Sequence, residues 1–194
     1  VILSGDQLYR MDFRKVMASH FDNKADITIA TLPVDREDAK GFGIMHTDDD
    51  GKITRFVEKP QEDSLLDELR MPKPLLEHCQ LPETEERYQA SMGIYVFNRK
   101  VMEECLDNDF QDFGKHIIPA AIEKYDVYNY IFQGYWEDIG TIRSFFESNL
   151  DLAKIVPDYD FFDADKQIYT NPRFLPASKI NAVSYTHLTL PTRS

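Results

Sequence analysis

The sequence alternates β-branched runs with helical stripes, and this alternation restricts the chain to a few fold classes. Residues 26–32, DITIATL, have the pattern of a buried strand, which Pro33 closes. Before this run, apolar residues at positions 13, 16, 17 and 21 share one face of a predicted helix, with Asp12 as a candidate N-cap. Together with a strand at residues 1–3, they predict a strand–helix–strand unit and a parallel sheet.

The remaining apolar runs continue this α/β pattern. Two predicted strands flank DDDG at residues 48–51, and Asp-Gly in this setting is a strong hairpin signal. Residues 91–97 and 127–132 are predicted strands, and residues 112–125 a pair of short helices. A second helical stripe, which we expect to face the core, comprises positions 142, 145, 146, 150 and 153.

Charge and cysteine content exclude several classes of function. The net charge of −12, from 22 basic and 34 acidic residues, argues against nucleic acids and anionic membranes as main partners. We expect no transmembrane helix and no secretory signal, because the required apolar runs are absent from the sequence. Cys79 and Cys105 lack Cys-x-x-Cys spacing, so we expect reduced thiols in a cytosolic protein rather than a zinc site.

Three charged residues, Asp6, Lys59 and Asp138, each close or follow a strand-like run. Ligands of open parallel sheets bind beyond the carboxyl ends of the strands. Carboxylates placed there can hold Mg²⁺, and a lysine can neutralise a phosphate. Each residue also has a purely local interpretation: Asp6 as a turn former, Lys59 as a surface charge and Asp138 as a helix N-cap. Spacing alone is therefore consistent with an α/β domain that carries a metal–phosphate site.

Seven segments together resemble the glucose-1-phosphate adenylyltransferase family, also called ADP-glucose pyrophosphorylase. Their order and spacing match that family from residue 1 through residue 180. SGDQLYRMD and YWEDIGT together are specific to the family, whereas EKP is shared among sugar nucleotidyltransferases. The segments are LSGDQLYRMDF, ADITIATLPV, GFGIMHTDDDGKITRFVEKP, ASMGIYVF, DFGKHIIPAAI, GYWEDIGTIRSFFESNLDL and IYTNPRFLPASKI.

This resemblance implies a reaction of ATP with α-D-glucose 1-phosphate that yields ADP-glucose and pyrophosphate, in glycogen or starch biosynthesis. Asp6 and Asp138 match the family's Mg²⁺-binding aspartates, and Lys59 matches the lysine that holds the sugar phosphate. Further positions that match contacts to the sugar phosphate are Gly43, Glu58 and Ser91. Because both reactants are anions, such a site works mainly by positioning and charge neutralisation.

The resemblance also implies a domain organisation. Residues 1–156 would form part of a Rossmann-like nucleotidyltransferase domain, with a mixed, mostly parallel sheet and flanking helices. Residues 157–183 would be a linker towards a left-handed β-helix. The family's Gly-rich, ATP-cradling loop would precede residue 1, so we expect a fragment that is truncated at its N-terminus, inactive by itself and prone to aggregate. Residues 184–194, SYTHLTLPTRS, do not resemble the family and are expected to be a non-native tail.

Three alternatives stay open at this point. One is a sugar-1-phosphate nucleotidyltransferase that uses another nucleotide, such as UTP or dTTP. Another is a catalytically weak regulatory subunit that binds sugar phosphate, and the last is an unrelated α/β binding domain. For the full-length parent, the resemblance implies a homo- or hetero-tetramer in the cytoplasm, or in a plastid if the source is plant-like.

Overall fold

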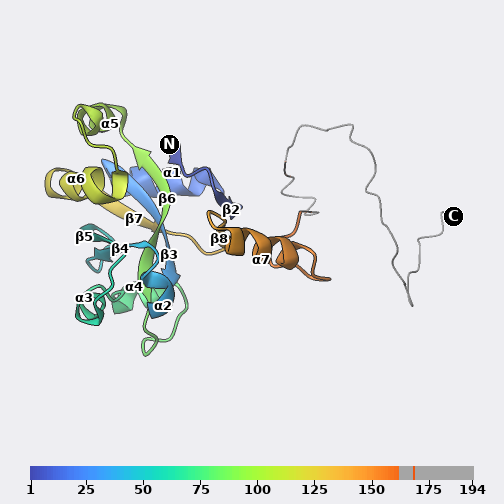
Figure 1. Cartoon of the computed structure of the whole chain (residues 1–194). Coiled ribbons are helices and arrows are strands. Elements are labelled where there is room, and N and C mark those ends of the chain that lie inside the picture. The colour runs from blue at the N-terminus through green and yellow to red at the C-terminus, as the bar shows by residue number, and fades with distance from the viewer. Residues whose placement is uncertain (162–167, 169–194) are drawn as a thin grey trace, which may run out of the picture. The chain divides into compact units, whose positions relative to one another are not determined.

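The computed structural model describes residues 1–161 and residue 168, and residue contacts divide the chain into Val1–Tyr159 and Asp160–Ser194. The predicted linker at 157–183 lies mostly outside the described residues, and the predicted tail at 184–194 lies entirely outside them. The first unit contains all the helices and strands of Figure 1. In chain order they are β1 (Ile2–Leu3), β2 (Gln7–Tyr9), α1 (Phe13–Asp22), β3 (Ile27–Val34), α2 (Arg36–Ala39), β4 (Gly43–Thr47), β5 (Ile53–Glu58), α3 (Asp63–Glu68), α4 (Lys73–His78), β6 (Tyr88–Phe97), α5 (Arg99–Leu106), the π-helix η1 (Phe113–Ile117), α6 (Ile118–Lys124), β7 (Val127–Ile131), β8 (Trp136–Asp138) and α7 (Ile142–Leu152).

The main sheet is mixed and has the order β5-β4-β6-β3-β7, with β1 also paired to β6. The α/β class and the mixed sheet are confirmed, but the expected predominance of parallel strands is wrong. Among the described strand pairs of this sheet, only β3–β7 is parallel. The reason is that β6 lies between β1 and β3: Tyr95 pairs antiparallel with Ile2 on one side and Ile29 on the other. The strands β1 and β3 therefore run in the same direction without being neighbours.

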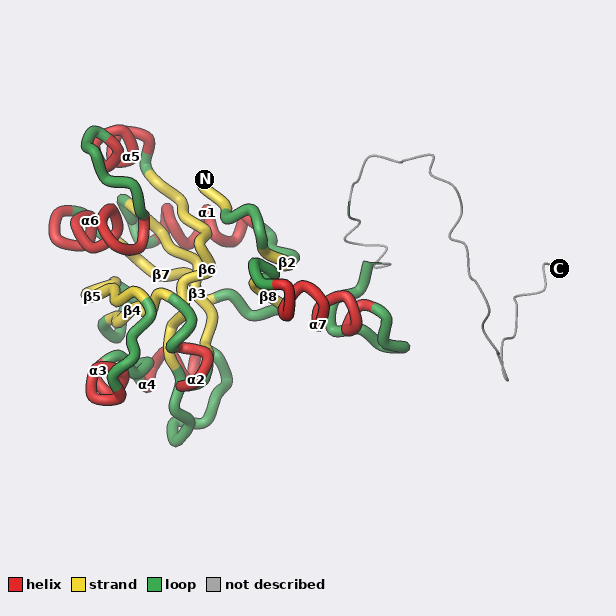
Figure 2. The backbone as a smooth tube through the Cα atoms, in the orientation of Figure 1, coloured by secondary structure: helices red, strands yellow, loops and turns green. Residues whose placement is uncertain are grey.

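Helices cover both faces of this sheet, as Figure 2 shows in red around the yellow strands. Alternate side chains of β3 face opposite sides, as the strand period of two requires. Ile27 and Ile29 pack with residues of α5 and α6, whereas Ala30 packs on the other side in the cluster that includes Phe13 of α1. The predicted N-cap of α1 is confirmed, because the Asp12 carboxylate accepts a hydrogen bond of 3.0 Å from the Arg14 amide.

The predicted hairpin is confirmed and its turn is anchored in the sheet. Gly51 has φ +82°, a conformation that glycine adopts without steric cost. The backbone oxygen of Gly51 accepts a hydrogen bond from the Asn129 amide, and a buried side-chain ladder of Thr47, Gln89 and Asn129 continues across the sheet. Because each buried polar group in this ladder is paired, the hairpin and the end of β5 are held in a defined position.

A second, two-stranded sheet is formed by β2 and β8, next to α7. The stripe of α7 that we expected to face the core is exposed instead: Ile142 is 91 % exposed, and Phe146 is 60 % exposed. The helix packs through its other face, on which Ser148 is buried. The periodicity therefore identified the helix correctly but not what its apolar face contacts. Within residues 1–161 and 168, no helix has the length and apolarity needed to cross a membrane.

Candidate functional site

A cavity of about 390 Å³ opens where the ends of β4 and β5 meet β6, β8 and η1. Its lining includes five of the six residues selected from the sequence: Gly43, Glu58, Lys59, Ser91 and Asp138. The sixth, Asp6, is adjacent to Asp138 beside this cavity. A smaller cavity of about 110 Å³ near α5 and α6 contains none of these residues. The six candidate residues come from four distant segments of the sequence. In the structure they lie in or beside one cavity.

Asp6 and Asp138 are brought together by the small sheet. The backbone pairs Gln7 with Asp138, and the Ile139 amide donates a hydrogen bond of 3.0 Å to the Asp6 carbonyl. The position that a Cβ atom would take on Gly140 is 2.9 Å from Asp6 Oδ2 and 2.9 Å from Asp138 Oδ1. Both carboxylates therefore approach one point beside Gly140, and a side chain at Gly140 would displace them.

The local interpretation of Asp138 as a helix N-cap is wrong. Thr141 caps α7, in a capping box with Ser144 in which the Ser144 amide donates to Thr141 Oγ1 over 3.0 Å. Asp138 is instead held by the Gly140 amide, which donates to Oδ1 over 2.8 Å, and Asp6 is held by the Ser4 hydroxyl, which donates to Oδ1 over 2.7 Å. These contacts orient the two carboxylates before any ligand arrives.

The donor set of this pair fits a hard divalent cation. Mg²⁺ is typically bound through one or two carboxylates and completes its octahedral shell with water and substrate phosphates. Within the described part of the chain, no three His, Cys, Asp or Glu side chains group as metal ligands. The pair therefore suits a metal shared with a phosphate ligand better than a cage formed by protein alone. Burial is the main cause of a raised pKa at Glu137, and the neighbouring charge of Asp138 adds to it.

Lys59 follows β5 in a left-handed backbone conformation, with φ +49°. Its amide donates to the Phe42 carbonyl over 3.0 Å, and its carbonyl accepts from Gln61 Nε2 over 3.0 Å. A non-glycine residue in this conformation costs about 1 kcal/mol, so the surrounding bonds must hold it there. Such strain is typical of functional sites, and here it places a lysine at the wall of the cavity.

Gly43 and Glu58 face each other as partners in the β4–β5 ladder. A Cβ atom on Gly43 would lie 2.8 Å from Glu58 Oε2 and would overlap the Phe56 ring. The glycine is therefore required by the close approach of β5 side chains, and its role in this structure is to make room for Phe56 and Glu58.

Ser91 lies on β6, where its hydroxyl accepts a hydrogen bond of 3.2 Å from the Gly93 amide. Gly93 has φ +65°, and the pairing of β6 with β3 shifts register close to this point. Ser91 still pairs with Thr31 of β3 beside this irregularity, and it lies at the cavity wall. Burial raises the pKa of the nearby Tyr95, which shares the wall, so its hydroxyl is neutral at physiological pH.

Sequence reasoning did not single out several residues that line the cavity, among them Gln7, Asp112, Phe113 and Gly114. The last three form DFG, residues 112–114, at the start of DFGKHIIPAAI. That segment contributed to the family resemblance but to no predicted site residue. Phe113 stacks on Tyr95 with ring centroids 5.4 Å apart. No sequence pattern could have found them, because propensity patterns do not reveal a π-helix, an element that recurs at functional sites.

Comparison with known proteins assigns this fold to a class. Residues 1–155 match the family model described as nucleotidyl transferase, so the chain belongs to the nucleotidyl transferase family. A similar protein is the glucose-1-phosphate adenylyltransferase small subunit, chloroplastic/amyloplastic, of Triticum aestivum, at 43 % identity over 185 residues. The match covers 93 % of this chain and 39 % of that protein, so the chain spans about two-fifths of the relative's length. The resemblance that the sequence motifs indicated is confirmed.

Proposed function

We propose that this chain provides the sugar-phosphate and metal-binding part of a glucose-1-phosphate adenylyltransferase, which converts ATP and α-D-glucose 1-phosphate into ADP-glucose and pyrophosphate. The observation that carries the proposal is the convergence of Lys59, Glu58 and Ser91 on one cavity, with the Asp6–Asp138 pair beside it. The Triticum aestivum protein, whose name states this activity, supports the choice of reaction.

The chemistry of the site suits this reaction. An oxygen of the glucose 1-phosphate phosphate attacks the α-phosphorus of ATP, and the bond from that phosphorus to the pyrophosphate oxygen breaks. Lys59 offsets the negative charge of the attacking phosphate and fixes its position. A phosphate monoester is already ionised near neutral pH, so no residue has to remove a proton from it. Mg²⁺ held by Asp6 and Asp138 would neutralise the phosphate charge that develops.

Glu58 and Ser91 suit recognition of the sugar. A carboxylate accepts hydrogen bonds from hydroxyl groups, and a serine hydroxyl can both donate and accept. Because both residues line the same cavity as Lys59, a sugar hydroxyl and the phosphate can be engaged together. A ligand that lacks either group should therefore bind more weakly.

The two nearest alternatives differ from this proposal in what they predict. Use of UTP or dTTP in place of ATP is less favoured, since the resemblance and the relative both point to an adenylyltransferase. A catalytically weak regulatory subunit that binds sugar phosphate is less favoured because Asp6, Lys59 and Asp138 are all in place. Pyrophosphate release by the complete parent enzyme, measured with ATP, UTP and dTTP in turn, separates these functions: a higher rate with UTP or dTTP would contradict the proposal.

Assembly and location follow from the same comparison. The relative's name describes a small subunit, which supports a hetero-oligomer for the parent of this chain, such as a tetramer with a second type of subunit. The same name states a chloroplast or amyloplast location, which supports a plastid rather than the cytoplasm. Sedimentation of the native complex and fractionation of the source tissue would test the two inferences.

Binding of glucose 1-phosphate to the purified chain in the presence of Mg²⁺, measured by calorimetry, tests the central proposal. Lys59→Ala should weaken binding by about tenfold or more, because a charge-assisted hydrogen bond to the phosphate is lost. Lys15→Ala, at an exposed lysine of α1, is the matched control and should leave affinity unchanged. Absence of binding to the unsubstituted chain, or equal effects of the two substitutions, would contradict the proposal.

A further inference from the structure

We propose that Gly114 is a positioning residue: its missing side chain lets η1 close on the Glu58 carboxylate and hold that group where it can accept hydrogen bonds from the sugar. This inference rests on the proposed function, because it assigns Glu58 to the sugar of glucose 1-phosphate. It concerns a residue that sequence reasoning did not single out and that contributes no side chain of its own.

Two elements, η1 and β4, confine the Oε2 atom of Glu58. A Cβ atom on Gly114 would lie 2.8 Å from Glu58 Oε2 and 3.4 Å from a carbon of the Phe56 ring. From β4, a Cβ atom on Gly43 would also lie 2.8 Å from Glu58 Oε2. The carboxylate therefore fits between the backbones of two glycines, in a space that any larger residue would enter.

The π-helix explains why the Gly114 backbone comes so close. Asp112 caps η1 by accepting a hydrogen bond of 2.8 Å from the Lys115 amide. The next residue, Phe113, stacks on the Tyr95 ring at 5.4 Å and so fixes η1 to β6. These two contacts, made by residues of the cavity wall, hold the first turn of η1 near β5, and Gly114 is the residue of that turn that lies against Glu58.

A methyl group at Gly114 should move Glu58 and leave the fold intact. The atom it would meet is the end of a flexible side chain, which can rotate away at little cost. Gly114 is not among the glycines with positive φ in the described residues, so alanine can adopt its backbone conformation. Glycine to alanine at such a position usually stabilises a protein slightly, by about 0.4–1 kcal/mol, through the unfolded state. Stability and sugar binding should therefore change in opposite directions.

Gly114→Ala in the full chain separates positioning from a structural role. We expect an unchanged or higher melting temperature, and affinity for glucose 1-phosphate lowered by about tenfold. Affinity for inorganic phosphate should change by less than about twofold, because Lys59 is untouched. Lys115→Ala, in the same turn and exposed, is the control and should change neither affinity. Equal losses for both ligands, or none for glucose 1-phosphate, would overturn the inference.

A double-substitution cycle tests whether the effect passes through Glu58. When Glu58→Gln is already present, adding Gly114→Ala should cost less than about twofold in glucose 1-phosphate affinity, because coupled residues are not additive. Additive losses would show that Gly114 acts elsewhere and would overturn the inference.

The Glu58 carboxyl ¹³C resonance of the ligand-free chain provides a readout that does not depend on the proposed function. It should shift in Gly114→Ala and stay in place in Lys115→Ala. If the unsubstituted chain does not bind glucose 1-phosphate, the proposed function fails, and this resonance still decides whether Gly114 positions Glu58. An unshifted resonance would overturn the inference even where binding is normal.

Discussion

Asp6 Oδ2 and Asp138 Oδ1 lie at the same distance, 2.9 Å, from the position that a Cβ atom would take on Gly140. The two carboxylates come from opposite ends of the described domain and meet only because β2 pairs with β8. Like charges that approach one point repel each other, and a cation between them removes this repulsion. Both carboxylates would therefore contribute to the proposed Mg²⁺ site.

Asparagine at either aspartate should abolish most of the affinity for a divalent cation. We expect Asp6→Asn and Asp138→Asn each to weaken Mg²⁺ binding by about tenfold or more, since a neutral amide is a poorer ligand for Mg²⁺. Calorimetric titration with Mg²⁺ checks this, with Asp22→Asn at an exposed position of α1 as the control. If the control loses as much affinity as the site variants, Mg²⁺ binds non-specifically and the assignment fails.

Two substitutions at Lys59 should separate its charge from its backbone strain. Both Lys59→Ala and Lys59→Gly remove the ammonium group and should lose sugar-phosphate binding. Only glycine relieves the left-handed conformation at φ +49°, so Lys59→Gly should be more stable than Lys59→Ala by about 1 kcal/mol. Chemical denaturation of the two variants measures this difference, and an alanine variant that is the more stable one would show that residue 59 is unstrained.

The ion pair between Arg36 and Glu86 should make stability depend on pH. A hydrogen bond from the Arg36 guanidinium, with NH2 to Oε1 at 2.5 Å, lowers the pKa of Glu86 to about 2. Because this pKa is lower in the folded than in the unfolded chain, the contribution is complete above about pH 5 and is lost as the pH falls towards 2.

Glu86→Gln should therefore destabilise the chain by about 1 kcal/mol near pH 7, the upper range for a surface pair, and by less near pH 3. The two side chains of this pair are 24 % and 36 % exposed. Urea denaturation at the two pH values measures the difference, with Glu123→Gln at an exposed position of α6 as the control. A loss of stability that is equal at both pH values would rule out ionisation of Glu86 as its cause.

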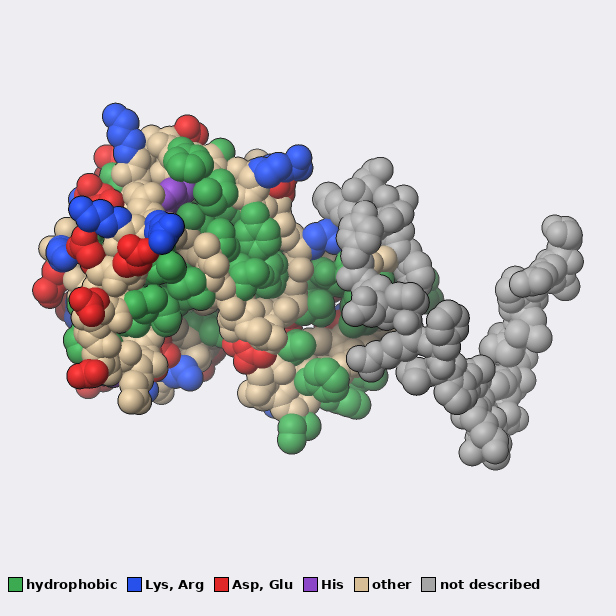
Figure 3. Space-filling view, turned by 90° about the horizontal axis from the view of Figure 1, so that it is seen from above, with side chains coloured by type: hydrophobic (Ala, Val, Ile, Leu, Met, Phe, Trp, Pro, Cys, Tyr) green, Lys and Arg blue, Asp and Glu red, His purple; other side chains and the backbone are tan. Residues whose placement is uncertain are grey.

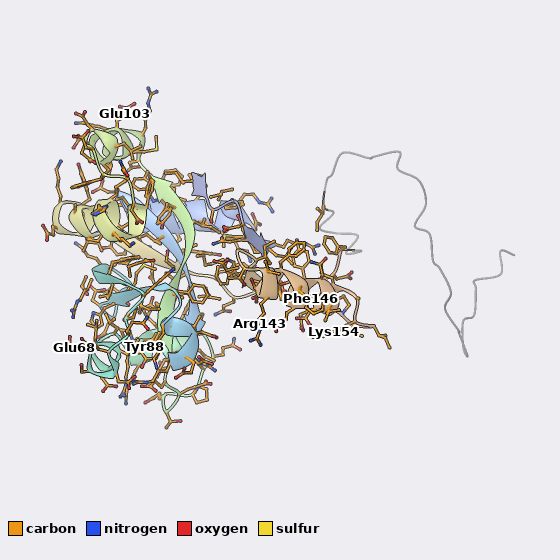
Figure 4. The ribbon with its side chains drawn as sticks, in the orientation of Figure 1. Glu68, Tyr88, Glu103, Arg143, Phe146 and Lys154 are labelled. Carbon is orange, nitrogen blue, oxygen red and sulfur yellow. The ribbon has the colours of Figure 1, made fainter. Side chains whose placement is uncertain are left out.

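The exposed apolar face of α7 should affect solubility more than stability. Phe146, labelled in Figure 4, is 60 % exposed, and Phe145 is 55 % exposed. Hydrophobic side chains also gather between charged ones on the surface seen in Figure 3. Exposed patches of this kind favour association, so replacing both phenylalanines by serine should lower light scattering on heating.

The same double substitution should change the free energy of unfolding by less than about 0.5 kcal/mol, as expected at exposed positions. Val16→Ser, at a fully buried residue of α1, is the contrasting variant and should cost about 2 kcal/mol or more. If the phenylalanine variant unfolds as easily as Val16→Ser, the α7 face is part of the core after all.

Short-range patterns in the sequence were enough to predict the local elements and to select the candidate site residues. The strand of residues 26–32, the Asp12 N-cap and the hairpin around Gly51 follow from short-range patterns, because period, capping and turn geometry involve only neighbouring residues. Asp6, Lys59 and Asp138 could be selected because charged residues that follow apolar runs stand out, and family motifs added Gly43, Glu58 and Ser91. No pattern of neighbours shows which distant segments meet.

Contacts between distant segments are seen in the folded chain alone. There β6 lies between β1 and β3, β2 pairs with β8 so that Asp6 approaches Asp138, and Gly114 lies against Glu58. The α7 stripe is exposed, although its periodicity is that of a core helix. The physical reason is that strand pairing and side-chain packing depend on long-range contacts, which short-range sequence patterns do not encode.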